Sequence, residues 1–297
     1  MATVRSMKEK RSGGTKGIMA ESKIKNVAVI GLGKMGNPIS RHLLNAGFVV
    51  TGFDVDAKAR DAAAVKGVKV AASPGEASAA ADLVIVIVAF EHDVETVLFG
   101  DNGITSQARP GTIVSIAATI SPEGTSRFAD RLSQQGFIPL DIPLCRGERP
   151  AEAGKLLITG GGDKAAFDAC RPAFATFASS IYHLGPSGAG QVGKMVNNLI
   201  LWACISANTE GFKLAGKYGV DEIAMREMLL DSSASNWALE TEVARHPMPW
   251  AEKDMMIVLA EADRLRVSLP LSGTLKEVIK SIKIDRDEHF PYNKPSK

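Results

Sequence analysis

NVAVIGLGKMG, residues 26–36, joins a short apolar run to a glycine-rich turn. The run Asn26–Ile30 is rich in β-branched residues, which is typical of a strand buried on both faces. Gly31, Gly33 and Gly36 match the pattern G-x-G-x-x-G, and apolar residues at helical spacing follow them. The stretch therefore predicts a strand, a tight turn and a helix in direct succession.

This turn also predicts a dinucleotide site, with contributions from Gly31, Leu32, Gly33, Lys34, Met35 and Gly36. The helix N-terminus offers unpaired N–H groups to a pyrophosphate. Asp54 ends the next expected strand, where its carboxylate can accept the ribose hydroxyls and repel a 2′-phosphate. Because Val55 supplies no arginine to bind such a phosphate, we expect NAD rather than NADP. A ligand-free glycine turn is the alternative, and the succession of strand, helix and Asp54 argues against it.

Apolar runs alternate with helical patterns through the first half of the chain. The expected strands after the first are 49–53, 83–88, 112–116, 137–141 and 156–159, and the last of these ends the series. Such alternation predicts βαβ units and a mostly parallel sheet. We therefore expect an α/β, Rossmann-type doubly wound domain over residues 26–185.

The pattern becomes purely helical from residue 186 to residue 297. No proline interrupts residues 190–217, where apolar residues recur at helical spacing, so one long helix is expected there. Further helices are expected at 221–230, 250–265 and 272–282. The second domain is therefore predicted to be all-helical.

The net charge of +2 is unevenly distributed along the chain. Residues 1–25 contain seven Lys and Arg against two Glu, which leaves −3 on the rest. These 25 residues have few large apolar side chains and no periodicity, so we expect a disordered basic tail. The acidic remainder makes a nucleic-acid partner an unfavoured interpretation.

Several classes of protein are excluded by composition. No stretch reaches the roughly 18 apolar residues of a membrane helix, so we expect no membrane partner. Cys145, Cys170 and Cys204 are widely spaced, with no CxxC pair and no histidine at ligand spacing. We therefore expect no disulfide framework, no metal site and a cytoplasmic location.

Lys194 and Asn198 are candidate catalytic residues because they project from one face of the long expected helix. A lysine beside a hydride-transfer site can exchange a proton with a hydroxyl or carbonyl oxygen. On spacing alone, an exposed helix lysine is the alternative. Lys253 and Asp254 lie at the start of a later expected helix. Without further information, the pattern favours an exposed pair there.

A second candidate lies in the loop DIPLCRG, residues 141–147, at the carboxyl end of an expected strand. Ligands bind at such ends in open α/β sheets. Arg146 there is suited to hold a carboxylate, sulfonate or phosphate by two-point contact. The alternative is a surface arginine paired with Glu148 or Glu152.

The order of these motifs resembles that of the β-hydroxyacid dehydrogenase family, which includes 3-hydroxyisobutyrate dehydrogenases. The resemblance spans residues 26–285 and rests on GLGKMGNP (31–38), DIPLCRG with AEAGKL (151–156), GQVGKMVNN (190–198) and KD (253–254). It implies a dinucleotide domain of the 6-phosphogluconate dehydrogenase type. It also implies a helical domain for substrate binding and dimerisation, and hence a homodimer or homotetramer with the active site between the two domains.

The resemblance also implies roles for single residues. Lys194 would be the general acid/base and Asn198 would orient the substrate. The remaining residues fall into a substrate loop of Cys145, Arg146 and Gly147, and a cofactor group of Ala89, Phe90, Thr119 and Lys253. No metal is implied.

The chain departs from the family pattern at three places. In the substrate loop, usually D-A-P-V-S-G-G, Cys145 and Arg146 replace Ser and Gly, which favours a strongly anionic substrate. Ile116 and Ala118 stand where the family has Asp and Ser, which weakens the role carried over to Thr119. The segment between Trp237 and Lys253 is shorter than usual, so we expect a remodelled pocket wall.

Together these features predict an NAD(P)-dependent oxidoreductase that interconverts a small anionic β-hydroxyacid and its semialdehyde or keto form. Hydride transfer would be coupled to proton exchange at Lys194. One alternative is an imine reductase on the same scaffold, although such relatives usually lack this lysine. The other is a non-catalytic nucleotide-binding module, in which Lys194 would be dispensable.

Overall fold

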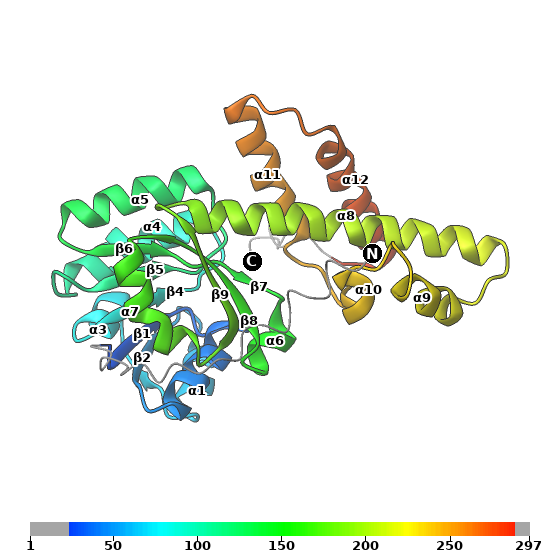
Figure 1. The fold of residues 1–297 in the computed structure, drawn as a ribbon. Helices are drawn as coiled ribbons and strands as arrows, with labels where there is room; N and C mark the ends of the chain where they lie inside the picture. Colours follow the sequence, from blue (N-terminus) through cyan, green and yellow to red (C-terminus); the bar gives the residue numbers. More distant parts are fainter. Residues whose placement is uncertain (1–23, 289–297) are drawn as a thin grey trace, which may run out of the picture.

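The computed structural model describes residues 24–288 (Figure 1). Most of the predicted basic tail, and residues 289–297, lie outside this range. Two residues assigned to the tail belong to the folded domain instead. Ile24 is buried against the core, and the N–H of Lys25 donates to Asp82 Oδ2 at 3.0 Å. The folded part therefore includes residues 24 and 25, before the boundary that the sequence predicts.

The first half of the chain forms one twisted sheet in the order β3-β2-β1-β4-β5-β6-β8-β7, with β9 beside β8. Its strands are β1 (Asn26–Ile30), β2 (Val49–Phe53), β3 (Lys69–Val70), β4 (Leu83–Val86), β5 (Ile113–Ile116), β6 (Ile138–Asp141), β7 (Leu144–Cys145), β8 (Leu156–Gly162) and β9 (Ala178–Gly185). Strands β1 to β6 are parallel, whereas β8 runs antiparallel to β6 and β7. This arrangement confirms the predicted doubly wound α/β fold.

The prediction that strands end at residue 159 is wrong. β8 continues to Gly162, and β9 follows it in parallel pairing. β9 lies at the sheet edge with alternate side chains exposed, among them Tyr182 and Leu184. It therefore lacks the continuous apolar run by which the buried strands are recognised.

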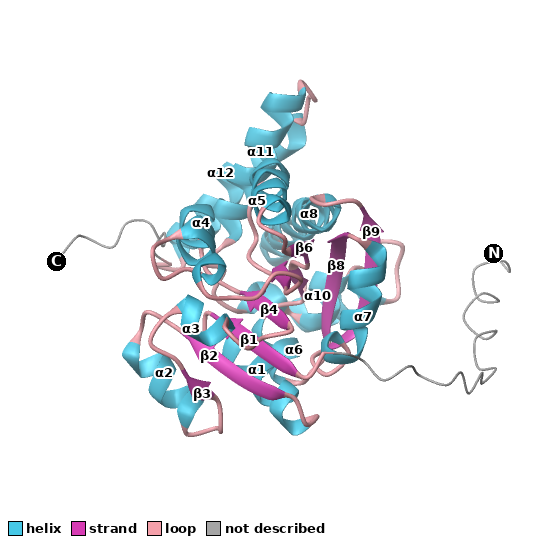
Figure 2. Ribbon diagram, turned by 90° about the vertical axis from the view of Figure 1, so that its left-hand side faces the viewer, coloured by secondary structure: helices cyan, strands magenta, loops and turns pink. Residues whose placement is uncertain are grey.

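Helices cover both faces of this sheet (Figure 2). They are α1 (Gly36–Asn45), α2 (Ala57–Ala64), α3 (Pro74–Ser78), α4 (Glu91–Phe99), α5 (Pro122–Gln134), α6 (Glu148–Glu152) and α7 (Lys164–Phe174), with a 3₁₀ turn η2 at Ile104–Ser106. Because side chains alternate along a strand, β1 contributes to two cores. Val27 and Val29 join the core under α1 and α7, and Ala28 and Ile30 join the core under α4 and α5.

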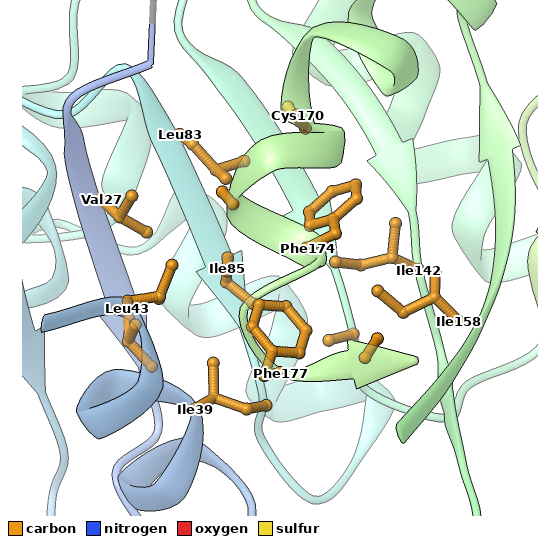
Figure 3. Packing of buried hydrophobic residues seen from close by; sticks show 14 of the residues in the cluster. Val27, Ile39, Leu43, Leu83, Ile85, Ile142, Ile158, Cys170, Phe174 and Phe177 are labelled. Atoms are coloured by element: carbon orange, nitrogen blue, oxygen red, sulfur yellow. The ribbon is translucent and has the colours of Figure 1, made fainter. Parts of the chain in front are cut away.

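The core beneath α1 and α7 is built from aliphatic and aromatic side chains (Figure 3). Ile39 and Leu43 of α1 pack with Phe174 of α7, and all three are fully buried. Burying a side chain of this size stabilises a fold by about 1.5–3 kcal/mol. The core therefore holds α1, and the glycine turn before it, against the sheet.

From residue 186 to residue 288 the chain is helical, as predicted. The elements are α8 (Ala189–Lys217), α9 (Glu222–Leu230), α10 (Trp237–Thr241), a 3₁₀ turn η3 (Val243–Arg245), α11 (Ala251–Leu265) and α12 (Pro270–Asp285). The long helix α8 begins against the sheet and extends away from it, with α11 and α12 on one side and α9 and α10 on the other (Figure 1). Its apolar residues Trp202 and Ile205 share a core with Met255 and Ile279. α8 thus connects the sheet with the remaining helices.

Candidate functional site

The glycine turn after β1 is shaped by close backbone approaches. Gly31 has φ +100°, and a Cβ placed there would lie 2.1 Å from the carbonyl oxygen of Ile87. A Cβ on Gly36 would lie 1.8 Å from the carbonyl oxygen of Gly31. Gly33, in contrast, has nothing within 4 Å of its own Cβ position. The turn therefore leaves open space over Gly33 beside the N-terminus of α1, which fits a pyrophosphate.

The other residues of the turn are placed differently. Leu32 is buried, with its side chain against Gly52, and Met35 packs on the core from the position just before α1. Lys34 is exposed, and its ammonium lies 3.2 Å from Glu148. Its side chain therefore links the turn to α6 at the surface.

Asp54 is held beside this turn by backbone donors. Leu32 N donates to Asp54 Oδ2 at 2.7 Å, and Asp56 N donates to Asp54 Oδ1 at 2.8 Å. Each oxygen keeps a further acceptor site for a ribose hydroxyl. Residue 55 supplies no arginine, but Arg60 of α2 donates to the carbonyl oxygens of Asp54 and Val55 at 2.7 and 3.1 Å. Helical spacing from α2 brings it there, which reading the adjacent residue alone misses.

Lys194 lies where α8 meets β7, the short strand that follows β6. Its Nζ donates to the carbonyl oxygen of Leu144 at 2.7 Å, and its side chain is half-buried. The neighbouring Cys145 is 2% exposed. One turn further along α8, Asn198 is buried and its Oδ1 accepts a bond of 3.0 Å from Asn197 Nδ2. The structure thus brings together Lys194, Asn198 and part of the predicted substrate loop.

Lys253 joins α11 to the loop after β4. Its Nζ donates to the carbonyl oxygen of Ala89 at 2.6 Å. The same ammonium lies 5.5 Å from the ring centroids of both Phe90 and Trp250, a distance at which cation–π attraction operates. The predicted residues Ala89, Phe90 and Lys253 therefore meet, and Trp250 joins them although the sequence does not single it out.

The two lysines belong to one buried charge cluster with Asp254. Burial lowers the pKa of Lys253, and the charge of Lys194 lowers it further against the opposing effect of Asp254. Burial raises the pKa of Asp254, which both lysines counteract. Burial also raises the pKa of the Cys145 thiol, opposed by Lys194. Buried groups with shifted pKa values that meet near the carboxyl ends of strands mark a candidate functional site, and two ammonium groups against one carboxylate suit an anionic ligand.

Thr119 is half-buried in the segment after β5. Its neighbours Ala118 and Ile120 are both hydrogen-bonded to the side chain of Gln191 on α8. Gln191 Nε2 donates to Ala118 O at 2.7 Å, and Gln191 Oε1 accepts from Ile120 N at 3.3 Å. Gln191 is the second residue of GQVGKMVNN, and no sequence pattern assigns it a role. Its place three residues before Lys194 is the signal that could have found it.

Asp141 is a second residue whose role the sequence does not reveal. It is fully buried at the end of β6, and its carboxylate accepts from Gly188 N and Gln191 N, each at 2.9 Å. Burial raises its pKa, although these backbone bonds oppose the shift. The side chain thus caps the N-terminus of α8 from another element.

Arg146 does not meet Lys194 through its guanidinium. It donates to Lys155 O at 2.9 Å, to Ser179 Oγ at 2.9 Å and to Ser180 Oγ at 3.1 Å. Its backbone has φ +88° and that of Gly147 has φ +83°, so the arginine occupies a conformation that favours glycine. These contacts favour an anchoring role, and substrate binding by Arg146 stays a prediction.

The alternative interpretation of Arg146, as a partner of Glu148 or Glu152, does not hold. Glu148 pairs with Lys34, and Glu152 pairs with Arg41 at 2.8 Å.

In residues 24–288 no group of three or more His, Cys, Asp or Glu is placed to hold a metal ion. That same part of the chain has no helix long and apolar enough to cross a membrane.

Each half of the structure matches a known domain family. The NAD-binding domain of 6-phosphogluconate dehydrogenase matches residues 26–185. The NAD-binding domain of NADP-dependent 3-hydroxyisobutyrate dehydrogenase matches residues 188–289. An NAD-dependent L-serine dehydrogenase of Pseudomonas aeruginosa is 35% identical over 217 residues, which are 73% of each protein.

Solved structures agree with these matches. A 3-hydroxyisobutyrate dehydrogenase of Mycobacterium tuberculosis with L-serine has a TM-score of 0.81 and 27% identity, and the match covers 90% of this chain and 96% of that one. An imine reductase from Pseudomonas sp. has a TM-score of 0.61 over 89% of this chain and 94% of its own, but its 19% identity extends the likeness to the fold alone. By sequence and by fold, this chain belongs to the β-hydroxyacid dehydrogenase family of oxidoreductases, which bind a nicotinamide dinucleotide.

Proposed function

We propose that this protein interconverts a small anionic β-hydroxyacid and its semialdehyde or keto form, with Lys194 as general acid/base. The observation that carries the proposal is the position of Lys194. Its ammonium lies on Leu144 O, beside the buried Cys145 and within the charge cluster of Lys253 and Asp254. This position near the carboxyl ends of the strands, where ligands bind in such sheets, supports a proton-transfer role for Lys194.

Bound nicotinamide dinucleotide supplies the hydride acceptor or donor. As the neutral amine, Lys194 takes the substrate hydroxyl proton during oxidation; as the ammonium, it gives a proton to the carbonyl oxygen during reduction. Asn198 orients the substrate from the next turn of α8, and Cys145 and Gly147 border it from the substrate loop. Lys253 offsets the negative charge of the substrate carboxylate.

The cofactor lies along the glycine turn in this proposal, with Thr119, Ala89 and Phe90 at its nicotinamide end. We propose NAD over NADP because the Asp54 carboxylate faces the turn and repels a 2′-phosphate. Arg60 is the competing feature, since its guanidinium lies on the Asp54 and Val55 carbonyl oxygens. Those bonds use Nη1 alone and leave Nη2 and Nε as donors, so turnover with NAD⁺ against NADP⁺ measures the carboxylate against Arg60.

The proposal includes a cofactor domain of residues 26–185 and a substrate and dimerisation domain from residue 186. Val192, Val196 and Ile200 are 43–56% exposed and lie four residues apart on α8. A second copy covering this stripe would give a homodimer or homotetramer, and light scattering that finds only a 31.5 kDa species would contradict it.

The free thiols of Cys145, Cys170 and Cys204 support a cytoplasmic location.

The activity is tested by a panel of L-serine, 3-hydroxyisobutyrate, 2,3-dihydroxypropane-1-sulfonate and the neutral 1,3-propanediol, each with NAD⁺ and with NADP⁺. We expect NAD-dependent oxidation of at least one acid and none of the diol. The cyclic imine 2-methyl-1-pyrroline with NADH and NADPH tests the alternative. Reduction of the imine without oxidation of any acid, or acid turnover with NADP⁺ alone, would contradict the proposal.

A further inference from the structure

The side chain of Gln191 joins α8 to the segment that follows β5. It is 1% exposed, and both ends of its amide are used. The donor reaches Ala118 O at 2.7 Å, and the acceptor receives Ile120 N at 3.3 Å. Gln191 thus bonds the main chain on either side of Thr119.

Gln191 also lies close to Lys194 along the helix. Residues three apart on a helix are neighbours on its surface, so both side chains leave the same turn of α8. Gln191 contacts the segment after β5, while Lys194 donates to Leu144 O of β7. A single helical turn therefore sets the distance between the 118–120 segment and the Lys194 ammonium.

The anchoring of α8 itself does not depend on this amide. Asp141 accepts from Gly188 N and Gln191 N, and Thr159 Oγ1 donates to Gly190 O at 2.9 Å. These bonds fix the first turn of α8 on β6 and β8. What the Gln191 side chain adds is the placement of residues 118–120 against that turn.

We propose that Gln191 is a positioning residue, which holds residues 118–120, and with them Thr119, against the turn of α8 that carries Lys194. This inference rests on the function proposed above. Because displacements of about 1 Å can lower a rate by up to about a hundredfold, losing this contact should act on kcat. Cofactor affinity should change little, because the proposed pyrophosphate and ribose contacts are at the glycine turn and Asp54, away from the nicotinamide end where Thr119 lies.

The test is Gln191→Met, which keeps the side-chain length and removes both hydrogen bonds. We expect faster amide hydrogen exchange at Ile120, measured by mass spectrometry with NADH bound. We also expect kcat to fall about ten- to hundredfold on whichever acid of the panel is oxidised fastest, with the Kd for NADH within about threefold. The exchange measurement needs no substrate, so it judges this proposal even if the proposed activity is absent.

Thr159→Val is the matched control, because it removes a bond to the same turn of α8 without touching residues 118–120. It should lower Tm and leave both kcat and the exchange at Ile120 unchanged. Gln191→Glu is the second variant should Gln191→Met not fold, since it keeps an acceptor for Ile120 N and loses the donor to Ala118 O. Its kcat should fall while Ile120 stays protected. Unchanged exchange in Gln191→Met, or equal losses of kcat in Gln191→Met and Thr159→Val, would overturn the proposal.

Discussion

Gly33 and Gly36 stand three residues apart at the start of α1, but only Gly36 is required by the packing of the protein itself. Gly36 is needed by the protein itself, because a Cβ there would meet the backbone of Gly31 at 1.8 Å. Gly33 has open space at its Cβ position. Only a ligand approaching that space gives a side chain at residue 33 anything to collide with.

This difference predicts opposite outcomes for two alanine substitutions. Gly33→Ala should keep the wild-type Tm and weaken NADH binding by at least about tenfold, since a methyl group would occupy the pyrophosphate space. Gly36→Ala should lower the free energy of unfolding by about 1–3 kcal/mol through overpacking. Thermal unfolding and NADH fluorescence titration measure the two effects. Wild-type NADH affinity in Gly33→Ala would show that the turn does not cradle the cofactor.

Single residues were predictable only where the reason for them is local. The glycine turn stands out because strand, turn and helix patterns extend over a few residues. Spacing alone leaves Lys194 open to interpretation as an exposed helix lysine, and only the family resemblance gives it a role. Gln191 bonds partners 71 and 73 positions away in the chain, and helical spacing carries no information about them. At Arg146 the residue type itself suggested the wrong partners. An arginine favours an anionic ligand, but its guanidinium donates to a carbonyl oxygen and two hydroxyl oxygens of the protein.

Among the elements, the buried parallel strands were predictable and the edge strands were not. β4 is apolar throughout, and β1 and β5 are apolar apart from Asn26 and Ser115, because helices cover both faces of these strands. β9 alternates exposed and covered residues, and β7 is only two residues long. The sequence therefore misses the two strands that pack with β8 beside the substrate loop.

The start of β1 depends on a charge contact with the strand beside it. Asp82 Oδ2, just before β4, accepts from Lys25 N at 3.0 Å and from Asn26 N at 2.9 Å, and Arg109 lies 3.4 Å from Oδ1. Burial alone would raise the pKa of Asp82, but the bonds from Asn26 and Lys25 outweigh it, so the pKa lies below 3.8. The ionised carboxylate therefore stabilises the folded state.

Asp82→Asn should lower the free energy of unfolding by about 1 kcal/mol at pH 7, because it keeps acceptors but loses the charge. A lowered folded-state pKa means that the stabilisation is complete above pH 3.8 and disappears as the pH falls through the lower value. Urea unfolding at pH 7 and below pH 3.8 should show the gap to wild type shrinking. The exposed Asp101→Asn is the control, and a gap that persists at low pH would refute this role.

At the scale of the whole molecule, the residues of the proposed active site come from segments far apart in the chain. α8 brings Lys194 to Leu144 O of β7. α11 brings Lys253 to Ala89 O, which is 164 positions away in the sequence. The order of motifs allowed both lysines to be assigned to one site, by family resemblance. Their shared charge cluster with Asp254, and the aromatic contacts of Lys253, depend on helix packing that no local pattern encodes.

The central claim is that Lys194 moves the proton in a reaction whose cofactor binds independently of it. The direct measurement compares Lys194→Ala with wild type for NADH affinity and for turnover of the best acid in the panel. Removing a general acid/base slows such reactions by about 10²- to 10⁴-fold, so we expect a loss in that range. The Kd for NADH should stay within about threefold, because the glycine turn and Asp54 are unaltered. Wild-type turnover in Lys194→Ala would contradict the account.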